Sequence, residues 1–213
     1  MKKLIYGVFA FAAMGLTACG ANDQEEVTNE TKTEDTKEEV VAETYNLNSE
    51  ESVLNWEGSW TGGKNDGKTH YGIVSISEGS VTKEGDNYKG SFTVDMNTIE
   101  VQDIDEASGK PKLEKHLNSE DFFNTSEYGT VNVTLNEIVD NKASITIDYH
   151  GVEMNETFPV EVNTSGDNMS ISGEFGVDFE KANMSGMQVN PEKPEDGKVS
   201  SMINFELEAE LSK

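Results

Sequence analysis

The amino-acid sequence predicts an all-β domain of antiparallel strands. From Thr44 onward, apolar and polar residues alternate in short runs that Gly, Asn and Asp separate. A period of two places successive side chains on opposite faces of a strand, so each run has one wet face and one buried face. The only clear helical pattern is short, at about residues 111–118. We therefore expect one all-β domain over residues 44–213 with a single short helix.

The same alternation predicts each strand in turn. It is clearest at residues 203–211, where Ile, Phe, Leu, Ala and Leu alternate with Asn and Glu. It also marks residues 92–96, 131–135, 145–147, 158–162, 169–171 and 175–179. Turn signals at residues 84–87, 140–141 and 165–168 lie between the runs, as hairpins require. Such strands must either stack as two sheets or close into a barrel, and composition leaves these two architectures even.

Residues 1–18 have the organisation of a secretory signal peptide. Two lysines precede an uncharged apolar run at residues 4–15, which is shorter than the ~20 residues that span a bilayer. The letters LTAC at residues 16–19 resemble the bacterial lipobox, in which the cysteine thiol is acylated and the chain is cut before it. An ordinary signal peptide with an incidental cysteine is the alternative. Because Cys19 is the only cysteine and stands at the cleavage position, we expect it to be lipidated.

Residues 19–43 are expected to form an acidic, flexible tether. They are rich in Glu, Asp, Thr and Asn and hold no aromatic residue, so they cannot bury enough apolar surface to offset the entropy of ordering. A tether of about 24 residues has an r.m.s. reach of roughly 25–30 Å. The sequence therefore predicts a lipid-anchored protein of the cell envelope, facing the periplasm or displayed on the outer-membrane surface.

Charge and motifs exclude several classes of function. The chain has 41 acidic residues against 16 basic ones, all of them Lys, and such a surface repels phosphate backbones. The sequence shows no nucleophile motif, no phosphate-binding Gly loop and no zinc spacing among its three histidines. We therefore expect no nucleic-acid partner, no catalytic residues, no metal and no cofactor.

Three sets of residues resemble the YceI-like, polyisoprenoid-binding family. They are WEG at 56–58 with HYG at 70–72, GSFTVDMNTI at 90–99 with LEKHLNSEDFFN at 113–124, and FPV at 158–160. They match the family patterns W-x-G … H-x-G, G-x-F-x-V-D-M-x-S-I, L-x-x-H-L-x-S-x-D-F-F and F-P-V. The resemblance covers about residues 44–211, which is nearly the whole of the predicted domain.

Two features depart from the family pattern. The family often has an I-D-R-x-x-F-G-I-like segment, whereas residues 171–177 here read ISGEFGV, with Ser172 and Gly173 in place of the Asp-Arg pair. The resemblance therefore assigns no role at the barrel rim to Ser172 and Gly173. The acidic segment 183–198, which contains Met184 and Met187, is not part of the family pattern.

The resemblance implies an extended, lipocalin-like antiparallel β-barrel of about eight strands with an apolar interior. It implies a non-catalytic protein that holds a long isoprenoid or other amphiphilic chain in the bore, as a lipid-anchored carrier or reservoir. From the residues alone a filled core is favoured over a tunnel, and the resemblance reverses this preference. The alternative function is an envelope interaction or stress-protective module with no small ligand. A second copy of the chain is a further candidate partner, and the two copies would form a homodimer.

The candidate ligand-binding residues share inward positions on the predicted strands or follow the short helix. They are Phe92, Val94, Phe122, Phe123, Val131, Val133, Leu135, Ile145, Ile147, Phe158, Val160, Phe175, Phe205 and Leu207. His70 is the candidate contact for a ligand headgroup, with a hydrogen bond at a turn as the alternative. We expect His116 to cap carbonyl groups of its helix, and Asp121 to act in a turn with Ser119. Trp56 and Trp60 should share one face of a strand.

Overall fold

The computed structural model describes residues 41–213; Cys19, the predicted signal peptide and most of the predicted tether lie outside the described residues. Within this range the chain forms ten β-strands and one α-helix. The strands are β1 (Glu43–Leu47), β2 (Val53–Thr61), β3 (Thr69–Glu84), β4 (Asn87–Val101), β5 (Thr130–Val139), β6 (Lys142–Tyr149), β7 (Val152–Pro159), β8 (Glu161–Ser165), β9 (Asn168–Asp178) and β10 (Lys198–Ser212). Helix α1 spans Lys110–Leu117, close to the predicted residues, and single 3-10 turns occur at Gly63–Asn65, Phe179–Ala182, Ser185–Met187 and Pro194–Asp196.

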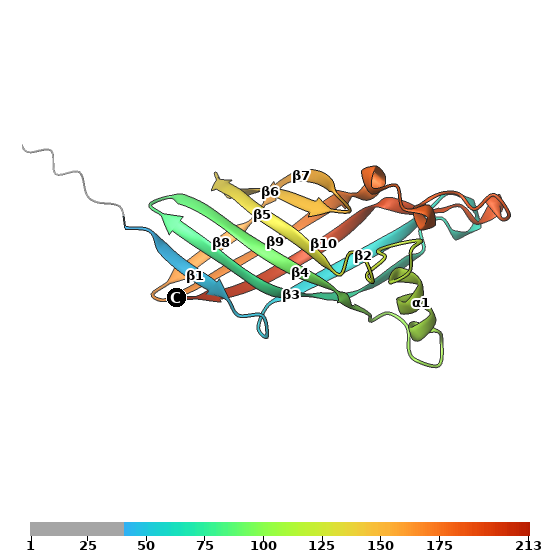
Figure 1. Ribbon diagram of the computed structural model, residues 1–213, viewed down its shortest axis with the longest axis horizontal. Helices are drawn as coiled ribbons and strands as arrows, with labels where there is room; N and C mark the ends of the chain where they lie inside the picture. The colour runs from blue at the N-terminus through green and yellow to red at the C-terminus, as the bar shows by residue number, and fades with distance from the viewer. Residues whose placement is uncertain (1–40) are drawn as a thin grey trace, which may run out of the picture. The chain divides into compact units, whose positions relative to one another are not determined.

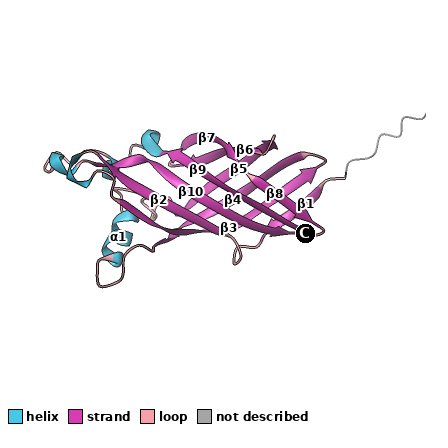
Figure 2. Cartoon of the chain, turned by 180° about the vertical axis from the view of Figure 1, so that it is seen from behind, coloured by secondary structure: helices cyan, strands magenta, loops and turns pink. Residues whose placement is uncertain are grey.

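The ten strands occupy eight positions around a barrel. Every pairing is antiparallel, in the order β7-β6-β5-β4-β3-β1-β10-β9-β8. Strand β2 also pairs with both β3 and β10, so β1 and β2 share one position, one after the other along the barrel. Strand β7 pairs with β6 and continues into β8, which pairs with β9, so these two share another position. Figures 1 and 2 show the resulting tilted strands, and the predicted barrel class is confirmed.

The barrel wall closes where β7 lies beside β9. A Cβ atom on Gly173 would lie 2.7 Å from the carbonyl oxygen of Pro159, so the absent side chain permits this close approach. Among the described strands no hydrogen-bonded ladder joins β7 to β9. Instead, the rings of Phe158 and Phe175 stack across this seam with their centroids 4.2 Å apart. Side-chain packing therefore replaces backbone hydrogen bonds in this part of the wall.

Alternation along each strand decides which side chains face inward. In β10 the predicted apolar positions are buried or half-buried, whereas the intervening Asn and Glu side chains are exposed. In β4 the phase shifts after Met96, and Ile99 and Val101 become the buried positions. The Asp95 carboxylate accepts the backbone N–H of Asn97 at 3.0 Å, which holds this irregular segment. The shift keeps the end of β4 facing the interior.

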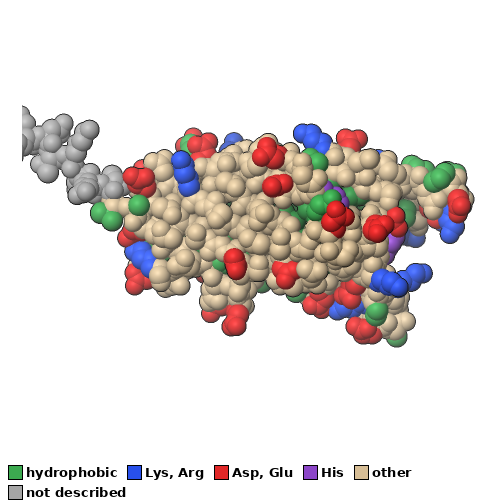
Figure 3. Space-filling model, in the orientation of Figure 1, with side chains coloured by type: hydrophobic (Ala, Val, Ile, Leu, Met, Phe, Trp, Pro, Cys, Tyr) green, Lys and Arg blue, Asp and Glu red, His purple; other side chains and the backbone are tan. Residues whose placement is uncertain are grey.

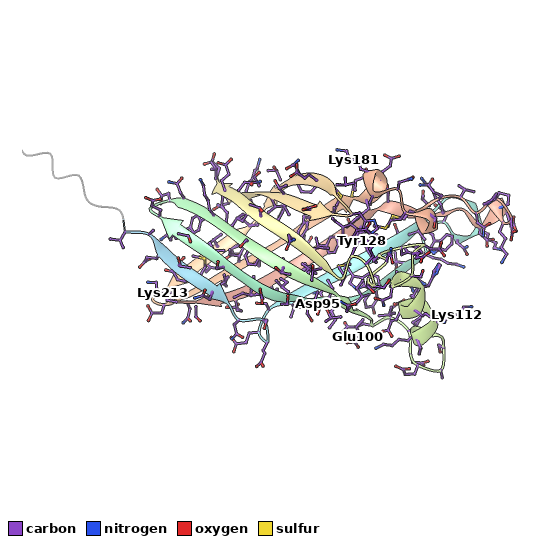
Figure 4. The ribbon with its side chains drawn as sticks, viewed as in Figure 1. Asp95, Glu100, Lys112, Tyr128, Lys181 and Lys213 are labelled. Carbon is purple, nitrogen blue, oxygen red and sulfur yellow. The ribbon has the colours of Figure 1, made fainter. Side chains whose placement is uncertain are left out.

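One end of the barrel is filled by a solid core. Tyr45, Val81, Met169 and Leu211 are each no more than 2 % exposed, and neighbouring strands bring them together. Lys213 lies at this end, where its Nζ atom is 2.7 Å from a Glu43 carboxylate oxygen (Figure 4). Helix α1 lies at the opposite end, with the long loops (Figure 1). An interior site can therefore open only away from the end at which β1 begins.

Candidate ligand-binding cavity

A cavity of about 290 Å³ lies inside the barrel and is lined from all eight strand positions. Val, Ile, Leu, Met, Phe and Trp side chains form most of its wall, and no Asp, Glu, Lys or Arg lines it. The polar side chains on the wall are Ser59, His70, His116 and Tyr149, apart from the indole N–H groups. Such a wall offers an apolar chain a dry environment and offers a charged group no counter-charge.

The structure brings every predicted bore residue to this cavity. The fourteen apolar candidates and His70 all line it: Phe92, Val94, Phe122, Phe123, Val131, Val133, Leu135, Ile145, Ile147, Phe158, Val160, Phe175, Phe205, Leu207 and His70. The interior is thus open along the part they line and filled at the Tyr45 end. Both arrangements considered from the sequence occur, in different parts of one barrel.

Aromatic rings form a continuous strip on one side of the wall. Phe175 stacks on Phe158 with centroids 4.2 Å apart and on Phe205 with centroids 5.4 Å apart. Each ring comes from a different strand, β7, β9 or β10. The strip therefore couples the seam between β7 and β9 to the hydrogen-bonded part of the sheet.

Both tryptophans of the chain line the cavity from β2. Trp56 and Trp60 are four residues apart in this strand and therefore share its inner face, as predicted. The Trp56 indole N–H donates to the carbonyl oxygen of Ile73 at 3.2 Å, which satisfies its one polar group. Since the chain has no other tryptophan, its intrinsic indole fluorescence reports on the cavity.

The segment after α1 covers the open end of the barrel. Phe122 and Phe123 are buried and line the cavity. The hydroxyl of Tyr149, at the end of β6, donates to the carbonyl oxygen of Phe123 at 2.7 Å in a buried hydrogen bond. Burial raises the pKa of the Tyr149 phenol, and the charge of Tyr128 raises it further. Tyr149 therefore stays a neutral donor that pins this segment to the barrel.

The acidic segment 183–198 is fastened to the same cover. The hydroxyl of Ser185 donates to the Asp121 carboxylate at 2.7 Å, and the Gly186 N–H donates to the Asp121 carbonyl oxygen at 2.7 Å. Met187 is buried and lines the cavity. A Cβ atom on Gly186 would overlap the Phe122 ring, so only glycine fits there without a shift. The Asp121 side chain thus binds a segment 64 residues away, whereas the Ser119 hydroxyl donates to the His116 carbonyl oxygen.

The prediction that His116 caps its own helix is wrong. The last carbonyl groups of α1 are satisfied by other residues: the Asn118 N–H donates to Glu114, and the Ser119 hydroxyl donates to the His116 carbonyl oxygen. The His116 ring instead packs edge-on against Phe122, with centroids 4.8 Å apart, and lines the cavity. It belongs to the wall at the covered end.

His70 forms a hydrogen bond with Asp103 that the sequence did not suggest. Its Nδ1 atom lies 2.7 Å from Oδ2 of Asp103, which follows β4, and the other carboxylate oxygen accepts the Tyr71 N–H at 3.3 Å. The His70 side chain is 38 % exposed and the Asp103 side chain only 12 %. Within residues 41–213 no group of three His, Cys, Asp or Glu residues is placed to hold a metal ion. The pair therefore stands as a polar contact at the rim of an apolar cavity.

Comparison with known proteins agrees with this geometry. The model of the YceI-like domain matches residues 45–211, which is most of the chain. The chain belongs to the YceI-like family. A comparison with curated protein sequences found no match.

Solved structures show the same fold as this YceI-like protein. A polyisoprenoid binding domain from Saccharophagus degradans has 15 % sequence identity and a TM-score of 0.56, covering 79 % of this chain and 97 % of that one. BcnA from Burkholderia cenocepacia has 14 % identity and a TM-score of 0.55, covering 77 % and 98 %. In residues 41–213 of the YceI-like protein, no helix is long and apolar enough to cross a membrane.

Several cavity residues of the YceI-like domain were not predicted. Leu113, Leu117 and Met187 lie outside the strands and reach the cavity only because α1 and segment 183–198 fold over the barrel end. Alternation in the strands could have identified Leu54 and Ile203, which occupy inward positions. Asp103 had no local signal, since its partner His70 is 33 residues away.

Proposed function

We propose that this YceI-like protein binds a long apolar or amphiphilic molecule, such as a polyisoprenoid or an isoprenoid quinone, inside the barrel. The observation that carries the proposal is the uncharged, apolar cavity that eight strand positions enclose. Largely apolar cavities of this kind favour ligands whose burial removes hydrocarbon from water. The Saccharophagus degradans relative is described as polyisoprenoid binding, which supports the same ligand class here.

The size of the cavity sets the affinity that burial can supply. At about 30 Å³ per methylene-sized group, the share of volume that a water molecule takes in the liquid, 290 Å³ holds about ten such groups. Burying ten methylenes at ~0.8 kcal/mol each contributes about 8 kcal/mol before the costs of association. An affinity no tighter than about micromolar follows from burial alone.

We further propose that the protein is a lipid-anchored carrier or reservoir in the cell envelope. The lipobox-like LTAC at residues 16–19 supports the anchor. The described chain enters the barrel at β1, at the end filled by Tyr45 and Val81, whereas α1 lies at the opposite end. Acidic side chains are spread over the face shown in Figure 3, so attraction to anionic headgroups does not hold the domain at a membrane. Membrane retention would then depend on the lipid.

The ligand proposal is tested on the chain from residue 20 onward, which keeps every described residue and omits the cysteine. The purified protein is extracted with organic solvent, and the extract is analysed by mass spectrometry. A stoichiometric lipid in the extract, or saturable uptake of added isoprenoid quinone by the emptied protein, is the expected result. Repeated blank extracts together with no uptake would refute the carrier function and leave an interaction or stress-protective module.

The anchor is tested separately in cells that make the full chain. Metabolic labelling with a fatty acid should mark the wild-type protein and not the Cys19→Ser variant, because the thiol is the acylated atom. The variant should also leave the membrane fraction. An unlabelled wild-type protein would reject the anchor. Protease treatment of intact cells then distinguishes surface display, in which the domain is cut, from a periplasmic location.

A further inference from the structure

The His70–Asp103 pair fixes the protonation of one ring nitrogen at the cavity rim. An ionised carboxylate can only accept hydrogen bonds, and Asp103 accepts from His70 Nδ1 at 2.7 Å and from the Tyr71 N–H at 3.3 Å. The proton of the neutral imidazole therefore sits on Nδ1, an assignment that follows from the hydrogen-bond geometry. Nε2 of that tautomer carries a lone pair and accepts a hydrogen bond.

This acceptor is available, whereas two other polar groups of the wall are already engaged. The Tyr149 hydroxyl and the Trp56 indole N–H are both used on backbone carbonyl groups. His70 lines the cavity, and none of the hydrogen bonds among residues 41–213 involves its Nε2 atom. A ligand that enters the cavity contacts the His70 ring, whose Nε2 atom is the ring nitrogen that Asp103 does not engage.

The surroundings of this acceptor disfavour a negatively charged ligand end. No Lys or Arg lines the cavity, so an anion would find no counter-charge there. The Asp103 carboxylate, which accepts a hydrogen bond from the His70 ring, adds like-charge repulsion at the same place. Discrimination against an anion therefore comes from a repulsive group as well as from missing partners.

We propose that His70 accepts a hydrogen bond from a hydroxyl at the end of the bound chain. Asp103 positions the His70 ring and fixes its tautomer. This inference rests on the proposed function, since it names the polar end of the ligand held in the same cavity. The ligand class is a lipid alcohol. The same chain ending in a diphosphate or in an ether binds less tightly.

The test uses the chain from residue 20 onward and a matched set of C15 isoprenoids. Farnesol, its methyl ether, its diphosphate and the corresponding hydrocarbon share one apolar chain and differ only in the end group. Binding is followed by the fluorescence of Trp56 and Trp60, which both line the cavity. The alcohol should bind about fivefold more tightly than the ether, the effect of one net hydrogen bond, and more tightly still than the diphosphate.

Three variants assign this preference to the pair. His70→Phe keeps a ring and removes the acceptor, so alcohol and ether should bind equally while the hydrocarbon is unaffected. Asp103→Asn lets the amide N–H donate to Nδ1, which moves the ring proton to Nε2 and should remove or invert the preference for the alcohol. Glu106→Gln, a nearby exposed carboxylate, is the matched control and should keep it.

The outcomes separate this inference from the proposed function. Equal wild-type affinities for alcohol and ether, or tightest binding of the diphosphate, would overturn the inference while chain binding itself stands. An alcohol preference that survives in a folded His70→Phe variant would place the contact elsewhere and also overturn it. Binding of none of the four compounds would refute the proposed function as well. The wild-type ligand series decides the question even if a variant fails to fold.

Discussion

Val133→Arg is the perturbation that most directly tests binding inside the barrel. Val133 is half-buried on β5 and lines the cavity, between Phe92 on β4 and Ile147 on β6. No acidic side chain lines the cavity, so an Arg at this position would place an unpaired guanidinium among apolar groups. Water that enters the cavity with the charged side chain can hydrate the guanidinium. The cost therefore falls mainly on ligand binding, which expels this water, and less on folding.

The expected loss of affinity follows from this desolvation. Removing a charged group from water in a protein interior costs several kcal/mol when no partner replaces the water. Even about 3 kcal/mol corresponds to more than a hundredfold weaker binding. That loss is a large share of the ~8 kcal/mol that burial of about ten methylenes contributes. Uptake of an isoprenoid should therefore be undetectable at micromolar protein.

A neighbouring substitution provides the control for this experiment. Asn132 precedes Val133 in the same strand, is exposed, and lies opposite Thr93 and Asp148 on the outer face. Asn132→Arg adds the same charge outside the barrel and should bind like the wild type. Binding is measured by titration with fluorescence detection, and thermal unfolding shows that each variant is folded. A folded Val133→Arg protein that binds within about threefold of wild type, a difference below 1 kcal/mol, would show that the bore is not the site.

Three further predictions concern the cover and the filled end of the barrel. Gly186→Ala should displace the Phe122 ring and speed ligand exchange, and Phe122→Leu in the same chain should partly restore slow exchange; unchanged exchange in stopped-flow measurements would contradict a covering role. Tyr149→Phe leaves a buried carbonyl without a donor and should lower the free energy of unfolding by about 1–3 kcal/mol in urea titrations. Lys213 holds the pKa of Glu43 below its ordinary value. The stability that this ion pair contributes is therefore present above the ordinary carboxyl range and is lost as pH falls through the folded-state pKa of Glu43. The urea midpoints of wild type and Lys213→Met should therefore differ slightly at neutral pH and converge in acid, and a gap that widens in acid would contradict this assignment.

The inward faces of the strands could be predicted because side-chain alternation is a local property of the pleat. Ile203 and Leu211 are buried as their spacing in β10 indicated, and Phe205 lines the cavity. The alternation predicted for residues 92–96 is confirmed, and its phase changes after Met96, where Ile99 and Val101 become the buried positions. The hydrogen bond from the Asn97 N–H to the Asp95 carboxylate holds this irregular segment.

The prediction of an open interior came from the YceI-like resemblance. The residues alone favoured a filled core. Residues such as Val133 and Ile145 would fill a solid core equally well in a narrower barrel. What leaves space is the eight-position closure, in which β1 with β2 and β7 with β8 each share one position. Pairing of this kind joins residues distant in the chain, so no single segment encodes it.

The sequence by itself determined the class of fold, the apolar inner wall and the lipobox-like motif around Cys19, because each depends on residues close together in the chain. Only the tertiary structure decided where the cavity ends and what its polar groups are. Contacts across 33 and 64 residues place Asp103 against His70 and fasten Ser185 to Asp121. Such contacts exist only after the strands have paired, since folding brings together side chains that no periodicity relates.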